Sequence, residues 1–239
     1  MGTTKSDFND ILIVDETEPC PYLEGQVARM PLCMPLTKIT PAEADVRLSC
    51  GFRRTGEFLY RTKCPTCNAC ESIRVDVNRF QFSKNARRVL KRGDRTFTQS
   101  VSELQADLER IDLFNRHRRS RGLAKRDTNI DVSEYAWGFV RSCFDSFEIT
   151  YRYEGDLVAV AICDLGRTSL SAVYTYYDPD FPKESIGTYS ILKQIQFCRE
   201  RKLQHLYLGY YVEESPHMVY KKRFRPHERL IEGQWVAFE

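Results

Sequence analysis

The sequence predicts an α+β protein in which a mixed or antiparallel sheet is flanked by helices. Residues 147–239 alternate between strand and helix signals, and the strand signals predominate. Six of the nine cysteines fall within residues 1–80, whereas residues 81–130 are basic and favour helices. Such shifts in composition divide a chain into regions. We expect a cysteine-bearing N-terminal region at 1–80 and a sheet-bearing domain at 81–239 whose basic helical segment is 81–130.

The first half of the chain gives few secondary-structure signals. A turn bracketed by glycines at Gly51–Gly56 precedes a short predicted strand, Phe58–Tyr60. From Lys84 to Arg95 basic residues recur at three- and four-residue steps, which is the spacing of one helical face. We therefore expect a basic helix in this segment, followed by a second basic run from Arg116.

The C-terminal third is the most regular part of the sequence. Phe147–Tyr153 alternates as a strand does, and Leu157–Cys163 is a continuous apolar run typical of a strand buried on both faces. Ser169–Tyr177 is a third predicted strand, which Asp178-Pro179 ends. Beyond it we expect a helix at Gly187–Lys202 and a strand at Leu206–Tyr211. A hairpin that turns at Glu232-Gly233 is expected at Arg229–Phe238.

Composition indicates a globular protein of a reducing compartment. Hydrophobic residues make up 42% of the 239 residues, and the net charge is only +3. The longest apolar run, Leu157–Cys163, is far shorter than the ~20 residues that cross a bilayer, so we expect no membrane partner. No charged-then-apolar leader opens the sequence, and nine cysteines cannot all pair. We expect a cytoplasmic protein with reduced or metal-bound thiols.

Three cysteines, Cys64, Cys67 and Cys70, are spaced as two C-x-x-C steps. A tight turn directs such thiolates toward one tetrahedral ion, and a structural site needs a fourth ligand. Cys20, followed by Pro21, is the candidate for that ligand. The set predicts either a structural zinc or iron–sulfur site that clamps the N-terminal segment, or a packed turn with free thiols.

Two basic runs contrast with an otherwise acidic chain. Residues 84–95 and 116–126 hold twelve basic residues and one acidic residue, whereas the other 216 residues carry 24 basic and 32 acidic. Concentrated positive charge is typical of a protein that binds a polyanion, although a solvated helix face is the alternative. We favour RNA, although charge alone does not distinguish tRNA from DNA or an anionic lipid, and we expect the contacts at Lys84, Arg87, Arg88, Lys91, Arg92, Arg118, Arg119, Arg121 and Lys221.

Arginines and tyrosines supply the remaining candidates. Arg53 and Arg54 lie between two glycines, and guanidinium groups bind carboxylates or phosphates through paired hydrogen bonds. A plain turn before a strand is the alternative. Tyrosines gather at 174–177, at 207–211 and at Tyr220, where they predict a groove that stacks a terminal base, although strand propensity also favours them. Gly209 within a predicted strand indicates the close approach of a ligand.

These segments, in this order, resemble the bacterial aspartate/glutamate leucyltransferases, which are relatives of the eukaryotic arginyl-tRNA–protein transferases. The similarity extends from about Cys20 to about Val236, nearly the whole chain. The segments that carry it are Cys20–Leu23, Gly51–Gly56, Tyr60–Cys70 with Ile73-Arg74, Arg87–Arg92, Leu170–Pro179, Ser185–Ser190, Tyr207–Tyr210, and Met218–Lys221 with Phe224–Pro226.

The resemblance implies a smaller N-terminal cysteine-bearing domain packed on a GNAT-like domain. It also implies an enzyme that moves leucine from Leu-tRNA to the N-terminal Asp or Glu of an acceptor protein. That transfer marks the acceptor for degradation by the N-end rule. We expect the reaction to need no cofactor, because an amine attacks an aminoacyl ester downhill. The candidates for catalysis are Tyr174, Tyr176, Asp178 and Tyr220. The candidates for binding the acidic N-terminus are Arg53, Arg54 and Arg74.

Three alternatives remain at this point. The donor is arginyl-tRNA in the first, with the same class of reaction. In the second, the chain is a GNAT-type acyltransferase that uses CoA, although residues 183–188 hold a single glycine where a pyrophosphate-binding loop needs several. In the third, the chain is a non-enzymatic tRNA-binding module with a zinc knuckle.

Overall fold

The computed structural model describes residues 8–122, 128–181 and 185–239. Lys125 and Arg126 of the second basic run, and Lys183 and Glu184 of the candidate phosphate loop, lie outside this range. The elements are β1 (Asp10–Val14), β2 (Thr17–Pro19), β3 (Val27–Arg29), β4 (Leu32–Pro35), α1 (Pro41–Ser49), β5 (Arg53–Thr55), β6 (Phe58–Tyr60), β7 (Glu71–Asp76), α2 (Lys84–Thr96), β8 (Thr98–Ser102), α3 (Leu108–Ser120), α4 (Val132–Tyr135), the π-helical turn η1 (Ala136–Val140), β9 (Asp145–Tyr153), β10 (Asp156–Leu165), β11 (Ser169–Tyr177), α5 (Ile186–Glu200), β12 (His205–Tyr211), the 3₁₀ turn η3 (Val219–Arg223), β13 (His227–Ile231) and β14 (Gln234–Phe238).

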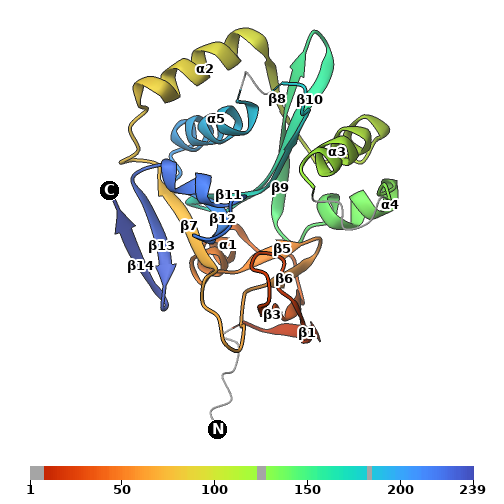
Figure 1. Cartoon of the computed structure of the whole chain (residues 1–239), viewed down its shortest axis with the longest axis vertical. Coiled ribbons are helices and arrows are strands. Elements are labelled where there is room, and N and C mark those ends of the chain that lie inside the picture. The colour runs from red at the N-terminus through yellow and green to blue at the C-terminus, as the bar shows by residue number, and fades with distance from the viewer. Residues whose placement is uncertain (1–7, 123–127, 182–184) are drawn as a thin grey trace.

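An eight-stranded sheet with the order β14-β13-β7-β12-β11-β10-β9-β8 forms the centre of the molecule. Its pairs are antiparallel except for β11 and β12, which run parallel. Helices α2 and α5 cover one face, and α3 with α4 covers the other (Figure 1). The predicted α+β class, a mixed GNAT-like sheet flanked by helices, is confirmed. None of the described helices is long and apolar enough to cross a membrane.

The core forms where apolar sequence runs meet across these layers. Nearly every residue of β10 is buried, because helices cover both faces of this central strand. On one face α5 packs against the sheet and α2 packs against α5, with Gly93 directly under the ring of Tyr189. On the other face Phe114 of α3 packs edge-on against several rings of α4, η1 and β11.

The N-terminal residues form a smaller sheet, β1-β4-β6-β5, below the large one (Figure 1). Helix α1 begins at a capping box in which Thr40 and Glu43 bond to each other's backbone amides. Asp45 of this helix accepts hydrogen bonds from Thr168 and Ser169 at the start of β11. Hydrogen bonds therefore fix the small sheet's helix to the large sheet.

Strand β7 joins the two regions more directly. It lies on the N-terminal side of residue 80, yet it pairs with β12 on one edge and with β13 on the other. The large sheet therefore draws strands from both sides of the boundary that composition indicates.

The parallel strands β11 and β12 diverge after a short pairing. Only Ser169–Ser171 pairs with His205–Tyr207, although both strands continue for several residues. A bulge follows in β12, where Gly209 has φ = +84° and the register with β7 shifts. We call the place between these unpaired ends the notch; there the two strands lack the backbone partners that a continuous sheet supplies.

Candidate functional site

The turn η3 packs against β12 and sends two consecutive side chains to opposite walls of the notch. Lys221 reaches β12, where its Nζ donates a hydrogen bond to the carbonyl of Tyr210 at 2.6 Å. Tyr220 instead faces β11 and the end of α3. Its pKa responds to the charges of Tyr177, Arg121 and Tyr174, which shows that these side chains are nearby. Tyr220 is 38% exposed, so this wall is open to solvent.

The wall formed by β12 holds a buried cation. Arg53 is 7% exposed, and its guanidinium donates to the carbonyls of Phe52 at 2.7 Å and Gly209 at 3.0 Å. Its Cζ lies 5.7 Å and 5.5 Å from the ring centroids of Tyr207 and Tyr210, within the range of cation–π attraction. Among the described residues, Arg53 forms no ion pair, and its buried Nε has no hydrogen-bond partner. Burial lowers the pKa of this guanidinium.

Lys221 carries the largest change in acidity at the notch. Burial, together with the positive charge of Arg53, lowers the pKa of Lys221 to about 7. The effect of Arg53 on that pKa places the two cations within electrostatic reach of each other. The sequence predicts Lys221 as a tRNA contact, whereas the structure places it beside the buried Arg53.

The wall formed by β11 and α3 combines aromatic and basic side chains. Burial raises the pKa of Tyr174, and the nearby Arg118 and Arg121 lower it. The guanidinium of Arg118 lies 5.6 Å from the centroid of Phe114. Two of the predicted catalytic tyrosines, Tyr174 and Tyr220, are therefore brought together beside two of the predicted tRNA contacts.

The other two predicted catalytic residues lie elsewhere. Tyr176 is fully buried on the α3 face, where its hydroxyl is 2.5 Å from that of Tyr135. Asp178 follows β11 and accepts a hydrogen bond from Arg116 at 2.6 Å, and its side chain is 12% exposed. It lines a cavity of about 370 Å³ together with Tyr153 and Phe181. The structure does not bring either residue to the notch.

The remaining candidate arginines already have carboxylate partners. The Nε of Arg54 lies 2.8 Å and 2.9 Å from the two oxygens of Asp164, and these side chains are 1% and 2% exposed. Arg74 donates to Glu228 at 2.6 Å and to the Tyr207 hydroxyl at 3.1 Å, and it stacks 4.0 Å from the Trp235 centroid. Of the three arginines predicted to read an acidic side chain, only Arg53 is left without a carboxylate among the described residues.

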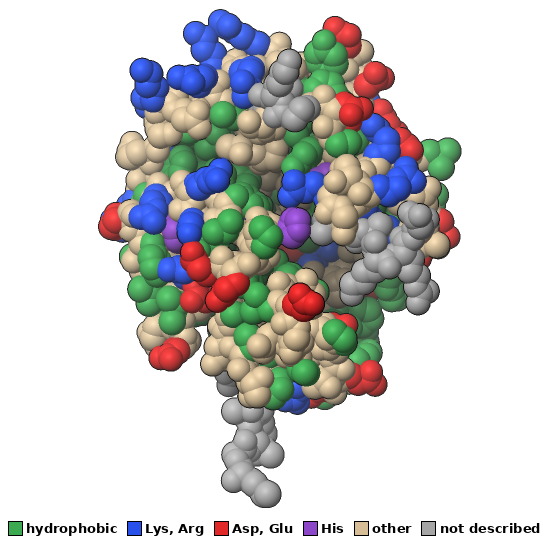
Figure 2. Space-filling model, viewed as in Figure 1, with side chains coloured by type: hydrophobic (Ala, Val, Ile, Leu, Met, Phe, Trp, Pro, Cys, Tyr) green, Lys and Arg blue, Asp and Glu red, His purple; other side chains and the backbone are tan. Residues whose placement is uncertain are grey.

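The predicted tRNA contacts form two basic faces. Helix α2 is capped by Ser83 and buries only Val89, Leu90 and Gly93. Its basic side chains are exposed, and Figure 2 shows them gathered over the helix at the top of the molecule. None of them forms an ion pair within the described residues. They are Lys84, Arg87, Arg88, Lys91, Arg92 and Arg95. The second face, at the end of α3, holds Arg118, Arg119 and Arg121, and Arg119 donates to Asn129 at 2.8 Å.

The four candidate metal ligands lie near one another. Burial raises the pKa of Cys70 to about 12, with further contributions from Cys20, Cys64 and Cys67. All nine cysteines are free thiols. Within the described residues, however, no three Cys, His, Asp or Glu side chains are arranged as ligands of a metal ion. The metal site predicted at Cys20, Cys64, Cys67 and Cys70 therefore stays a prediction, because a closed site needs four convergent ligands.

Sequence reasoning missed how closely these thiols approach the notch. Tyr22, which follows Cys20 in the chain, has a pKa raised by burial and by Tyr60, Cys70 and Tyr210. Tyr60 in turn packs 6.3 Å from Tyr210, on the same wall as Arg53. A tyrosine two residues from a cysteine was the only available signal, and strand or loop propensity explains it equally well.

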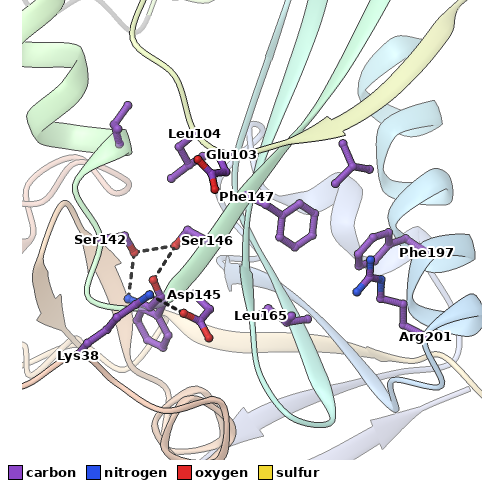
Figure 3. A pocket seen from close by; sticks show the side chains of 13 residues that line it. Lys38, Glu103, Leu104, Ser142, Asp145, Ser146, Phe147, Leu165, Phe197 and Arg201 are labelled. Atoms are coloured by element: carbon purple, nitrogen blue, oxygen red, sulfur yellow. Dashed lines mark hydrogen bonds and ion pairs between the residues drawn. The ribbon is translucent and has the colours of Figure 1, made fainter.

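A larger cavity, of about 640 Å³, lies at the opposite end of the sheet (Figure 3). Phe147, Leu165 and Phe197 line it, and Lys38 pairs with Asp145 at 2.6 Å on its rim. Leu165 opposes Leu170 near the paired start of β11, so the cavity is remote from the diverging end. It contains none of the predicted site residues, and we do not assign it to the reaction.

The fold is GNAT-like, with a mixed sheet covered by helices on both faces. Two family models match the chain: "Arginine-tRNA-protein transferase, N terminus" over residues 18–88 and "Arginine-tRNA-protein transferase, C terminus" over residues 109–231. The chain belongs to the arginine-tRNA–protein transferase family. It is therefore an enzyme, an aminoacyl-tRNA–protein transferase, whose partners are an aminoacyl-tRNA and an acceptor protein.

Relatives and solved structures agree with this assignment. The chain is 35% identical to an aspartate/glutamate leucyltransferase of Acinetobacter baumannii over 97% of this chain and 86% of that protein. It is also 35% identical to an aspartate/glutamate leucyltransferase of Vibrio cholerae, over 96% of this chain and 98% of that protein. The resemblance seen in the sequence is confirmed. In fold, it is similar to the C-terminal domain of a lysylphosphatidylglycerol synthetase from Agrobacterium fabrum (TM-score 0.50, 16% identity, 71% of this chain and 58% of that one) and to FemX (TM-score 0.50, 10% identity, 75% and 64%).

Proposed function

We propose that this enzyme transfers leucine from Leu-tRNA to the N-terminal Asp or Glu of acceptor proteins. The observation that carries the acidic acceptor is Arg53, a buried guanidinium at the notch with no carboxylate of its own among the described residues. Support for leucine comes from the two relatives named as leucyltransferases. Charged tRNA as the donor places the reaction in the cytoplasm, where such tagging leads to degradation by the N-end rule.

The basic side chains of α2, with Arg119 and Arg121 at the end of α3, would hold the backbone of the tRNA, because they are exposed and form no ion pair with the described residues. Each phosphate they neutralise releases counterions, so binding would be strong at low salt and weak at high salt. Tyr174 and Tyr220 would stack the terminal adenosine at the notch, with Arg118 and Arg121 beside them. Tyr176 and Asp178 have no part in this arrangement, because each is engaged with a protein partner elsewhere.

The transfer itself balances without a cofactor. The neutral α-amine of the acceptor attacks the carbonyl carbon of the aminoacyl ester, a C–N bond forms, and the C–O bond to the ribose breaks. The ribose oxygen takes up the proton that the amine loses. An α-amine has a pKa of about 7.7–8.0, so a useful fraction is neutral at pH 7. Holding amine and ester together in the notch then supplies most of the rate as effective molarity.

A transfer assay with purified protein tests the proposal. Labelled Leu-tRNA and, in parallel, labelled Arg-tRNA are mixed with peptides that differ only at residue 1: Asp, Glu, Arg or Ala. We expect label on the Asp and Glu peptides only, and from Leu-tRNA only. Label from Arg-tRNA would contradict Leu-tRNA as the donor but would still show an aminoacyl-tRNA–protein transfer. Tight tRNA binding without transfer from either donor would contradict the proposed function.

A further inference from the structure

Two cations bind consecutive carbonyls of β12 at the notch. Arg53 donates to the carbonyl of Gly209 at 3.0 Å, and Lys221 donates to that of Tyr210 at 2.6 Å. Gly209 lies between these contacts at the bulge, where its φ of +84° favours glycine, and a Cβ built there would meet the Lys221 Nζ at 3.6 Å, an ordinary contact.

This pair of charges is uncompensated. Neither cation forms an ion pair in the part of the chain that the structure describes. A carbonyl oxygen carries only a partial charge, so holding the buried Arg53 and the half-buried Lys221 against two carbonyls raises the free energy of the empty site. The Arg53 Nε–H is buried and unbonded, which leaves a donor for an incoming anion. Such a site is complementary to one small anion.

We propose that Arg53 and Lys221 together form the pocket for the side-chain carboxylate of the acceptor's first residue. The inference rests on the proposed function and deepens it, because it adds a specificity-determining residue that the sequence assigns to tRNA. A carboxylate would accept from the free Nε–H of Arg53 and from the ammonium group of Lys221. The flexible lysine stem accommodates both Asp and Glu, and a neutral Asn or Gln would leave both charges unmatched.

A tRNA phosphate fits this position less well than a carboxylate does. Arg53 is 7% exposed, whereas the phosphate backbone of a polyanion needs cations that it can reach from outside. The chain has such cations on α2 and at Arg119 and Arg121, all exposed. A carboxylate on a stem of one or two carbons reaches inward and keeps its α-amine at the notch, opposite Tyr220.

The test compares Lys221→Met with Lys222→Met as a matched control. Lys222 is the next residue of η3, and it pairs with the exposed Glu213 at 2.7 Å away from the notch. The measurements are kcat/KM for pentapeptides that begin with Asp, Glu or Asn, the affinity for Leu-tRNA, and the dissociation constants of the same peptides by calorimetry without donor. We expect Lys221→Met to lower kcat/KM and affinity for the Asp and Glu peptides by about 10- to 100-fold, the loss of one charge-assisted hydrogen bond. The Asn peptide, the tRNA affinity and the control variant should be unchanged.

Other outcomes overturn the pocket in distinct ways. Equal losses for Asp and Asn peptides with normal tRNA affinity would make Lys221 a participant in the transfer step. A proportional loss of tRNA affinity would make it a phosphate contact. If the ratio of kcat/KM for the Asp peptide to that for the Asn peptide is unchanged, Lys221 does not determine specificity. If the wild-type protein transfers no leucine, the proposed function fails, and the calorimetric comparison of Asp and Asn peptides still decides the pocket. Arg53→Lys, which keeps the charge, should retain the preference in part.

Discussion

Replacing Arg54 with methionine separates a structural arginine from a substrate-binding one. The guanidinium contacts both oxygens of Asp164 at 2.8 Å and 2.9 Å, in a site where the two side chains are 1% and 2% exposed. Without it, the hydrogen bond that Ser146 donates at 2.6 Å is the one that the Asp164 side chain keeps among the described residues. Breaking a buried pair by removing one partner costs about 3–5 kcal/mol. We take about 3 kcal/mol, because one nitrogen of Arg54, Nη2, has no partner to lose.

Urea denaturation followed by circular dichroism measures this loss. With an m-value of about 2 kcal/mol/M, the midpoint of Arg54→Met should fall by roughly 1.5 M. Arg79→Met is the control, because its pair with Glu239 is exposed and screened by solvent, so its loss should leave the midpoint nearly unchanged. The additional change Asp164→Leu should recover part of the stability, since an apolar pair replaces an unmatched carboxylate. The reasoning would be refuted by an Arg54→Met protein that keeps the wild-type midpoint and loses its preference for Asp over Asn.

Four further changes test the site and its surroundings. Tyr176→Phe should lower the free energy of unfolding, measured in urea, by about 1 kcal/mol and leave kcat unchanged. A fall in kcat would indicate that Tyr176 contacts the substrate. Arg87→Gln combined with Arg88→Gln should weaken tRNA binding and reduce its salt slope by about 1 to 2, measured by filter binding across a salt series; an unchanged slope would place the tRNA elsewhere. Gly93→Ala places a methyl group 2.3 Å from a ring of α5 and should cost about 1–3 kcal/mol in urea; an unchanged midpoint would contradict the close contact. Lys221→Met should be more stable than wild type, most of all below pH 7, because the folded-state pKa of about 7 lies below the unfolded value of 10.5. Its advantage over the wild type should shrink as pH rises from 7 to 10.5. An equal difference in melting temperature between the variant and the wild type at pH 6 and at pH 9 would contradict this.

The sequence predicts the strands that are bounded by turn-forming residues. Strand β11 matches the predicted Ser169–Tyr177, because a glycine turn precedes it and Asp178-Pro179 follows it. Helix α5 and the C-terminal hairpin are also confirmed within a few residues. Strand β1 carries no such signal, since four of its five residues are exposed and its apolar run does not alternate. Its pairing with β4 is set by the tertiary fold, which a local pattern does not reveal.

The site is less predictable because its decisive contacts are remote in sequence. Arg53 and Arg54 are neighbours with the same chemistry, and only the position of Asp164, 110 residues later, separates their environments. Tyr174 and Tyr176 likewise share one face of a strand, yet Tyr135 of α4 takes the hydroxyl of only one of them. Residue type and spacing identify the candidates, and long-range packing decides which of them remain free.

The position of β7 in the middle of the large sheet has a consequence for biosynthesis. Arg74 in β7 bonds to Glu228 in β13, and 154 residues separate them. At about 5–20 residues per second, a ribosome needs roughly 8–30 s to deliver the second strand after the first. Until β12 is made, β7 has neither neighbour, and its unpaired edges are a template for association with other nascent chains. Both strands that pair with β7 lie in residues 205–239, so β7 gains its partners only at the end of synthesis.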